Sequence, residues 1–320
     1  MVCFFIKRIF LLIIMIGFPV VCLGSFPNFR KKKKHINTQL AVKQFKVFQS
    51  MDEFDVSMDF TDASNKEQRL LKMNDPIIQL CKDLYFKNKL SSLDEKKDPI
   101  IPKRVHLIWV GPKTPPPIFN ECLESIKKHL PTWECKVWRD EDVENLNLSN
   151  QKFYDEEKNY GAKSDILRYE LLYNFGGLYL DIDMVVQKPL DILHHTYEFY
   201  VGLHPSSLPD IIGNAVIASV PGHPILKKCI ESIKFHRNQE SILHRTGPIF
   251  FQQIFFDLVI QNKFPRVIAF PASYFFPLDP YKDFGKKKKE FVKTETFTVH
   301  YWANSWLPDD NHVWDLTKLW

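Results

Sequence analysis

The sequence predicts an α/β fold, and two stretches support this prediction. In the first, an apolar run over 104–110 is followed by apolar residues at helical spacing and by a second short apolar run over 135–138. Such a β-α-β pattern predicts two parallel strands joined by a right-handed crossover. In the second, a helix beginning at Asp165 leads through two glycines into a strand over 178–186. Ligands of open α/β sheets bind beyond the carboxyl ends of strands, so functional residues are expected there.

Each predicted element has its own local signal. The first helix repeats apolar residues three and four apart from 119 to 130 and stops before Pro131, which cannot continue it. The second helix has Ser164 as its N-cap and Gly176 just after its last turn. A last strand is expected over 296–302, where β-branched and aromatic residues gather.

The positive charge of the chain is concentrated at its amino-terminal end. The 320 residues contain 43 Lys and Arg and 38 Asp and Glu, which gives a formal net charge of +5. Residues 1–34 contain seven of these cations and no acid, which leaves the rest of the chain near −2. A nucleic-acid binder needs a basic face on its folded domain, so no nucleic-acid partner is expected.

The first 24 residues have the pattern of a targeting segment. Lys7 and Arg8 precede an apolar run over 9–23, which is shorter than the roughly 20 residues that span a bilayer. A signal peptide and an uncleaved signal anchor that would contact the membrane both fit this pattern. We therefore expect a membrane-associated or secretory-pathway protein: a single-pass Golgi-type protein in a eukaryote, or an envelope or secreted protein in a bacterium. Residues 25–98 are interpreted as a basic flank and a helical stem or N-terminal subdomain, and 99–320 as the main domain.

Two carboxylates in the strand over 178–186 are the centre of the functional prediction. Tyr179, Asp181 and Asp183 alternate with apolar residues and so are expected on one face, with the two acids about 6–7 Å apart along the chain. Unpaired carboxylates are costly to bury, and a hard divalent cation such as Mg²⁺ or Mn²⁺ removes that cost. The plainer interpretation is a strand end whose acids face water.

Other candidate residues have two interpretations each. Asp165 and Arg168 lie one helical turn apart and form either an ordinary ion pair or a set of contacts to sugar and phosphate. His300 is either a third metal ligand or a structural histidine. Trp109, at the end of the first strand, either stacks on a base or packs in the core, and periodicity alone favours the core.

Four segments together resemble one family. They are 101–111, 164–183 with the run SDILRYELLYNFGGLYLDID, 213–224 and 299–306. In this order they resemble the DXD-containing sugar-binding glycosyltransferases, the family of the fungal α-1,6-mannosyltransferases, related to the glucosyltransferase domains of large clostridial toxins. The resemblance covers about residues 100–306. It implies a GT-A fold, a UDP- or GDP-sugar as donor and Mn²⁺ (or Mg²⁺) as cofactor.

The resemblance also implies roles for individual residues. The catalytic residues would be Asp181, Asp183 and Arg168, and the metal ligands would be Asp181, Asp183, His300 and Asn304. The donor would be bound by Trp109, Val110, Ser164, Asp165, Arg168, Tyr179, Asn214, Ser305 and Trp306. The tripeptide Thr246-Gly247-Pro248 resembles a family turn on the acceptor side.

The implied activity is transfer of a sugar from the nucleotide to a glycan, lipid or protein acceptor, with retention at the anomeric carbon. Two alternatives remain open from the sequence. In a HAD-like phosphohydrolase, Asp181 would be the phosphoryl nucleophile and Asp183 an acid/base, because LYLDIDMV also fits an apolar strand followed by D-x-D. A non-catalytic sugar-binding protein would use the same site for binding alone.

Overall fold

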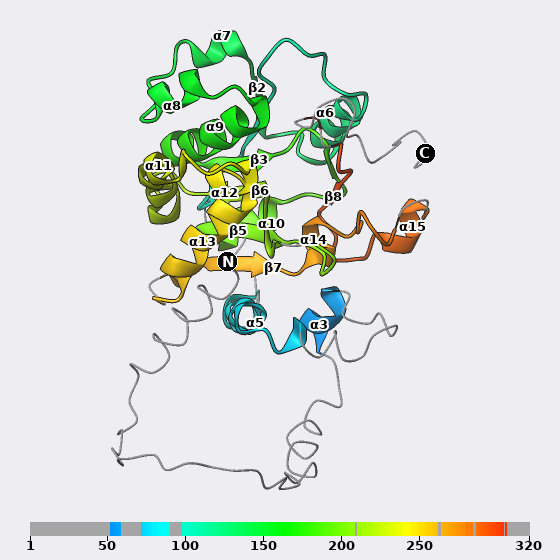
Figure 1. The fold of residues 1–320 in the computed structure, drawn as a ribbon. Coiled ribbons are helices and arrows are strands. Elements are labelled where there is room, and N and C mark those ends of the chain that lie inside the picture. Colours follow the sequence, from blue (N-terminus) through cyan, green and yellow to red (C-terminus); the bar gives the residue numbers. More distant parts are fainter. Residues whose placement is uncertain are drawn as a thin grey trace, which may run out of the picture. The chain divides into compact units, whose positions relative to one another are not determined.

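The computed structural model describes residues 52–58, 72–89, 98–208, 210–261, 264–283, 286–303 and 305. All of them belong to the unit Ser50–Trp320, whose described parts are drawn in colour in Figure 1. The expected targeting segment over 1–24 and most of the expected stem over 25–98 lie outside the described residues. Within the described part of the chain, the helices are too short or too polar to cross a bilayer.

A six-stranded sheet organises this unit, and its strands follow the order β2-β1-β3-β6-β5-β7. Only β6 runs antiparallel to its neighbours β3 and β5, and the other pairings are parallel. The predicted α/β class is therefore confirmed. The strands are β1 (Arg104–Ile108), β2 (Glu134–Trp138), β3 (Gly177–Leu180), β5 (Phe199–Leu203), β6 (Ile212–Ser219) and β7 (Val267–Phe270).

The predicted β-α-β unit is present as β1, α6 (Ile118–His129) and β2. The two strands pair in parallel, with Val105 opposite Cys135. Helix α6 buries Phe119, Cys122 and Ile126 on the face that its sequence spacing predicts. The first strand ends at Ile108, two residues earlier than predicted, so Trp109 and Val110 lie beyond its carboxyl end.

The helix before the acidic motif begins earlier than predicted. Helix α9 covers Tyr160–Phe175, and its N-cap is Asn159, whose side-chain oxygen accepts from the Ala162 N–H at 3.1 Å. The prediction of Ser164 as N-cap was wrong, because its hydroxyl donates to the Tyr160 carbonyl inside the helix. The predicted end is confirmed: Gly176 has a φ of 62°, and a Cβ there would lie 2.6 Å from the Pro221 side chain.

The strand predicted over 178–186 is broken at the acidic motif. The chain leaves the main sheet after Leu180, turns through 181–183 and continues as β4 (Met184–Val186) in a separate two-stranded sheet with β8 (Thr298–His300). The Met184 N–H donates to the Asp181 carbonyl at 3.0 Å, which closes this turn. The prediction that Asp181 and Asp183 share one strand face was therefore wrong, since neither residue is in a strand.

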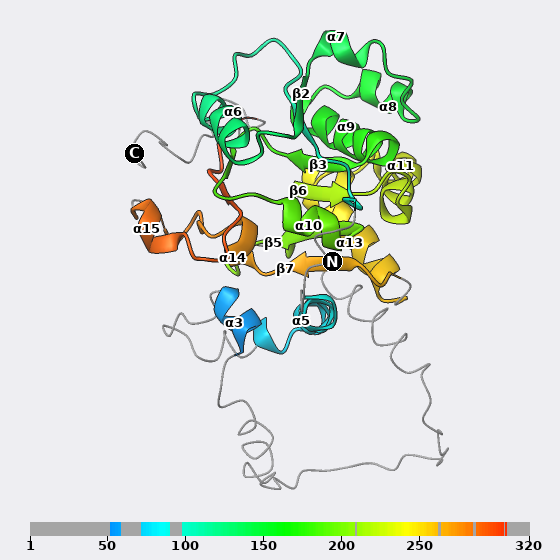
Figure 2. The same ribbon diagram turned by 180° about the vertical axis from the view of Figure 1, so that it is seen from behind.

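Helices pack against the six-stranded sheet and beside its β7 edge. Helices α9, α11 (Pro224–His236) and α13 (Pro248–Val259) pack together, and the Tyr169 ring of α9 stacks on Phe251 of α13 at 5.9 Å between centroids. Figures 1 and 2 show α5 (Pro76–Asn88) beside β7. The remaining helices are α3 (Glu53–Ser57), α7 (Asp140–Val143), α8 (Gln151–Glu156), α10 (Asp191–Thr196), α12 (Ile242–Arg245), α14 (Ala272–Phe275) and α15 (Lys288–Phe291).

A neutral histidine ties β1 to the end of α9. The His106 ring is fully buried; its Nε2 donates to the Gly176 carbonyl at 2.8 Å, and its Nδ1 accepts from the Trp138 indole N–H at 3.0 Å. Both ring nitrogens are therefore satisfied only in the neutral form. Burial lowers the pKa of His106 to about 4, against the opposing effect of the Gly176 carbonyl.

Acidification is expected to destabilise the fold through His106. The unfolded chain binds this proton near the ordinary pKa of about 6.5, whereas the folded chain resists it until about pH 4. The contribution of neutral His106 to the free energy of unfolding is thus complete above about pH 6.5 and is lost as the pH falls. From pH 7 to pH 5 the free energy of unfolding should fall by about 1–2 kcal/mol from this residue. Urea unfolding at the two pH values should show a smaller loss for His106→Gln.

The exposed His244 provides the matched control, because His244→Gln should lose as much stability between pH 7 and pH 5 as the wild type. Buried His194 and His223 act in the same direction, since burial lowers their pKa values to about 3 and about 4. The His106→Gln variant therefore keeps part of the pH dependence. Equal losses in the wild type and His106→Gln would contradict the prediction.

Candidate functional site

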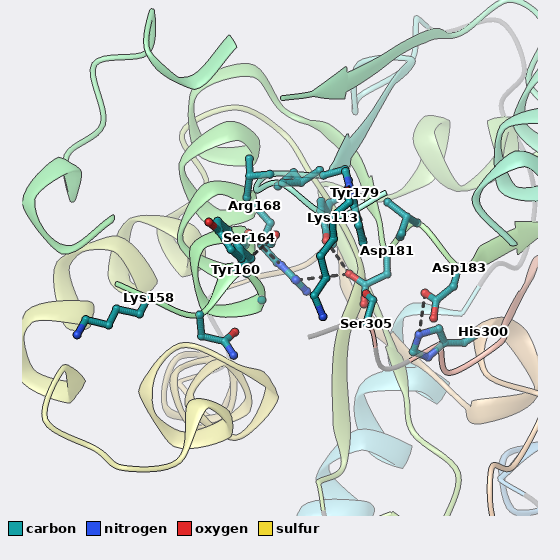
Figure 3. A pocket seen from close by; sticks show the side chains of 16 residues that line it. Lys113, Lys158, Tyr160, Ser164, Arg168, Tyr179, Asp181, Asp183, His300 and Ser305 are labelled. Carbon is teal, nitrogen blue, oxygen red and sulfur yellow. Dashed lines mark hydrogen bonds and ion pairs between the residues drawn. The ribbon is translucent and has the colours of Figure 1, made fainter. Parts of the chain in front are cut away.

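A cavity of about 320 Å³ opens beyond the carboxyl ends of β1 and β3 (Figure 3). It gathers side chains from the end of β1, the first turns of α9, the turn after β3 and the end of β8. Asn304 and Trp306 lie outside the described residues. The predicted site residues that line this first cavity are Trp109, Val110, Ser164, Arg168, Tyr179, Asp181, Asp183, His300 and Ser305.

An acid–imidazole cluster forms one end of the cavity. One ligand atom from each of Asp181, Asp183 and His300 lies within 4.8 Å of the others. The pairing of β4 with β8 places Met184 opposite His300, so the preceding turn meets the imidazole. His300 Nε2 lies 3.1 Å from Asp183 Oδ1, and the pair is drawn with a dashed line in Figure 3.

The charge state of Asp183 follows from its surroundings. Burial raises its pKa, but His300 and the Ala303 N–H, which donates to Oδ2 at 2.7 Å, outweigh burial and lower it. Burial alone would lower the pKa of His300, and the Asp183 carboxylate raises it above the ordinary value. His300 Nδ1 is buried without a hydrogen-bond partner among the described residues. Two carboxylates and an imidazole with an unused nitrogen are a donor set that suits a divalent metal ion.

Asp181 is the more exposed of the two acids, with 29% of its side chain accessible. Its Oδ1 accepts from the Tyr179 hydroxyl at 2.6 Å and lies 3.4 Å from the Arg168 Nη2. The Arg168 guanidinium in turn lies 4.3 Å from the centroid of the Tyr179 ring. These contacts fix one oxygen of Asp181, and the carboxylate lines the cavity.

Asp165 and Asn214 hold Arg168 from behind and do not line the first cavity. Asp165 is 5% exposed; it accepts from Asn214 Nδ2 and from Thr246 Oγ1, each at 2.9 Å, and lies 3.1 Å from Arg168 Nη2. Arg168 Nη1 donates to the Asn214 carbonyl at 2.6 Å. Burial raises the pKa of Asp165 to about 6, against the lowering effects of Arg168, Thr246 and Asn214. Together with Asp181 and Tyr179, Asp165 and Asn214 orient the guanidinium.

Trp109 and Tyr160 shape the other end of the cavity. The half-buried Trp109 packs against the core and also lines the cavity, and its indole N–H donates to the Lys113 carbonyl at 2.7 Å. Gly111 has a φ of 94°, and a Cβ there would lie 2.6 Å from the Tyr160 ring. Only a glycine allows that ring to close against the loop.

The cavity is also lined by residues that were not predicted from the sequence, among them Lys113, Lys158 and Tyr160. Tyr160 was missed because α9 starts five residues before its predicted start, and the two lysines lie in loops where no periodicity marks them. Thr246 was noticed only as part of a turn. Asp165 could have indicated it, because a carboxylate buried on α9 needs hydrogen-bond donors from other segments.

Three comparisons show which known proteins this chain is similar to. Residues 116–200 match the family model described as "Glycosyltransferase sugar-binding region containing DXD motif". An uncharacterised glycosyltransferase of Acanthamoeba polyphaga mimivirus is 26% identical over 216 residues, 65% of this chain and 85% of that protein. Inositol phosphoceramide mannosyltransferase 3 of Schizosaccharomyces pombe is 28% identical over 159 residues, 47% of this chain and 43% of that enzyme. Among solved structures, the PaToxG glycosyltransferase is 20% identical, with a TM-score of 0.44 and coverage of 57% of this chain and 76% of that one.

The sequence-based resemblance to the DXD-containing glycosyltransferases is thereby confirmed. The chain spans 43%, 63% and 50% of the lengths of three fission yeast mannosyltransferases that it matches.

Removal of Asp165 is expected to destabilise the fold strongly. In Asp165→Ala, Arg168 loses its buried ion-pair partner, and Asn214 and Thr246 lose the acceptor of their hydrogen bonds. This loss should lower the free energy of unfolding by about 3–5 kcal/mol. Thr246→Val removes one neutral donor and should cost about 1–2 kcal/mol. Urea unfolding at pH 7 measures both. Asp155→Ala, which removes an exposed acid on α8, is the control; an Asp165→Ala variant as stable as this control would contradict the prediction.

Proposed function

We propose that the chain, a glycosyltransferase with a DXD-containing sugar-binding region, transfers a sugar from a UDP- or GDP-sugar with the help of Mn²⁺ or Mg²⁺. The observation that carries this proposal is the convergence of Asp181, Asp183 and His300 in one cavity with Trp109. Beside it are Arg168 and two lysines, Lys113 and Lys158, whose positive charge suits a diphosphate. The carboxylates of Asp181 and Asp183 in the same cavity would repel a bare diphosphate, so the site suits a complex of a diphosphate with a metal ion.

Each residue has a defined task in this proposal. Asp181, Asp183 and His300 would hold the divalent ion, and Asn304 is a further candidate from the sequence. When bound, the ion neutralises the charge that develops on the leaving diphosphate. The Trp109 ring offers an apolar surface for the base, whereas Val110, Ser164, Tyr179 and Ser305 line the donor cavity. Trp306 is proposed from the sequence alone.

Arg168 has a different task from the one first expected. Its side chain is 6% exposed, and its guanidinium already contacts Asp165, Asp181 and the Asn214 carbonyl. We therefore assign it chiefly to the positioning of Asp181, with Asp165 and Asn214 positioning the guanidinium. A buried cation at this point also adds to the positive potential that a departing diphosphate experiences.

The proposed reaction proceeds with retention at the anomeric carbon. The acceptor hydroxyl oxygen bonds to the anomeric carbon as the bond from that carbon to the diphosphate oxygen breaks. The bonding electron pair remains on the diphosphate, and the hydroxyl proton passes to it. The first cavity offers no carboxylate free of these tasks among its described residues, which supports substitution from one face without a covalent enzyme intermediate. The acceptor class is a glycan, lipid or protein.

A phosphohydrolase is less well supported. It needs Asp183 as an acid/base, and that carboxylate is 5% exposed and already held by His300 and the Ala303 N–H. The relatives are named as glycosyltransferases and mannosyltransferases, which leaves the non-catalytic alternative without support as well.

The decisive assay is a panel of UDP- and GDP-sugars with and without Mn²⁺, read out as release of the nucleoside diphosphate. The wild type should release the nucleoside diphosphate from one of these donors when Mn²⁺ is present, and from none of them when it is absent. Asp183→Asn keeps the size of the side chain and an acceptor for the Ala303 N–H, but removes the negative charge that would hold the metal. This variant should reduce turnover by about a hundredfold or more.

Asp155→Asn is the matched control, since it makes the same chemical change at an exposed position on α8, and it should keep wild-type turnover. Direct Mn²⁺ titration of each variant by calorimetry separates metal binding from catalysis. Equal turnover and equal Mn²⁺ affinity in the wild type and Asp183→Asn would refute the assigned metal site.

We further propose that the protein works at a membrane or inside a secretory compartment. The support is the sequence of residues 1–24, with two cations before an apolar run. Expression of the full chain in a eukaryotic cell should place it in the membrane or secretory fraction, and a chain lacking residues 1–24 should stay in the cytosol. Recovery of the full chain from the cytosol with an intact amino terminus would contradict this proposal.

A further inference from the structure

The acidic residue between α8 and α9 holds the backbone that follows it. Glu157 is the C-cap of α8, and its Oε1 accepts from the N–H groups of Lys158 and Asn159, each at 2.9 Å. Its other oxygen, Oε2, accepts from Arg245 Nε at 3.0 Å. Both oxygens of one carboxylate are therefore bonded, one to the chain that enters α9 and the other to the end of α12.

The backbone that Glu157 holds forms one wall of the first cavity. Residues 158–161 line this cavity in succession, and Lys158 and Tyr160 are labelled in Figure 3. The Tyr160 ring lies so close to the loop at Gly111 that a Cβ there would come within 2.6 Å of it. The position of residues 158–161 therefore sets the width of the cavity at this end.

Arg245 connects Glu157 to the segment before α13. The side chain of Arg245 is 17% exposed and that of Glu157 is 13% exposed. Arg245 Nη1 also donates to the carbonyls of Gln239 and Glu240, at 2.8 Å and 3.2 Å. An ion pair that is largely withdrawn from water and has further hydrogen bonds is held in one geometry, whereas an exposed ion pair contributes little.

Neither partner of this ion pair is part of the described lining of the first cavity. Both line a second cavity of about 380 Å³, whose described lining shares no residue with that of the first. They therefore reach a donor in the first cavity through residues 158–161. We propose that Glu157, held by Arg245, is a positioning residue that fixes this wall of the donor cavity. The inference rests on the proposed transferase function and adds to it an ion pair outside the cavity.

The surroundings of the ion pair predict an effect on donor binding and not on the chemical step. Thr246 follows Arg245 in the chain; its hydroxyl donates to Asp165 at 2.9 Å, and its carbonyl accepts from the Tyr169 hydroxyl at 2.7 Å. These two bonds hold Thr246 independently of the ion pair. Loss of the ion pair should therefore displace residues 158–161 and leave Asp165 and the acid–imidazole cluster in place.

The test replaces each charged partner by a neutral side chain. Glu157→Gln keeps an acceptor for the two backbone N–H groups and removes the charge that faces Arg245, and Arg245→Gln removes the other charge. With the donor and metal identified by the nucleotide-sugar panel, each variant should raise the donor KM by about fivefold to tenfold, with kcat within about twofold of the wild type. Calorimetric titration with UDP or GDP in the presence of Mn²⁺ should show the same loss of affinity without any turnover.

The double variant distinguishes a shared interaction from two separate effects. If the ion pair causes the effect, Glu157→Gln combined with Arg245→Gln should raise the donor KM about as much as either change alone, because each removes the same interaction. Two independent losses would multiply instead. Glu156→Gln is the matched control, since it makes the same chemical change one residue earlier, at a side chain that is 57% exposed, and it should keep the wild-type KM.

A purely structural role of Glu157 has a different signature. It would lower the apparent kcat through loss of folded protein at an unchanged donor KM, and urea unfolding of each variant measures that loss. An unchanged donor KM and nucleotide affinity in Glu157→Gln, or a multiplied KM in the double variant, would overturn the positioning role.

Failure of the positioning role is distinguishable from failure of the proposed function. In the results that overturn the positioning role, the wild type still releases the nucleoside diphosphate, so the proposed transferase function stands. Absence of release from every nucleotide sugar would refute the proposed function itself. The titration with UDP or GDP would then still measure whether Glu157 affects nucleotide binding in the cavity.

Discussion

The buried ion pair between Asp165 and Arg168 is the interaction on which the site depends. Taking both charges out of water is costly, and the cost is met only because each group finds further partners. Asp165 also accepts from Asn214 and Thr246, and Arg168 also contacts Asp181 and the Asn214 carbonyl. The pair therefore connects α9, β6, the turn before α13 and the end of β3. One electrostatic requirement fixes the relative positions of four segments that are distant in sequence.

The departure of the chain from the main sheet after β3 is the second constraint. Had the strand continued in the main sheet, Asp181 and Asp183 would still have shared one face, but the next residues would not have been available to pair with β8 and bring His300 beside them. The turn at 181–183 instead delivers both acids to one cavity, and the pairing of β4 with β8 adds the imidazole. A six-stranded sheet thus supplies the frame, and a two-stranded sheet completes the cluster.

Local patterns predicted those parts of the fold that depend on neighbours in sequence. The β-α-β unit, the glycine that ends α9 and the strand around residue 299 follow from apolar spacing and glycine chemistry. The start of α9 was missed because Asn159 is as good an N-cap as Ser164, and the continuation through Tyr160 is decided by tertiary contacts. The break after Leu180 was missed because alternation of apolar residues continues through Ile182. Of the site, sequence could name the acids and Arg168, but the contact between Thr246 and Asp165 joins segments that meet only in three dimensions.

The position of β8 has a consequence for how the protein is made. The family-matched region ends at residue 200, and the imidazole that completes its acidic cluster is His300. A chain emerging from the ribosome can form β1, β3 and α9 well before β8 is available. In the interval β4 has no strand partner, and Asp183 lacks the histidine that lowers its pKa. The cluster is therefore assembled by one of the last described segments to be synthesised, which keeps an incomplete chain from presenting a finished site.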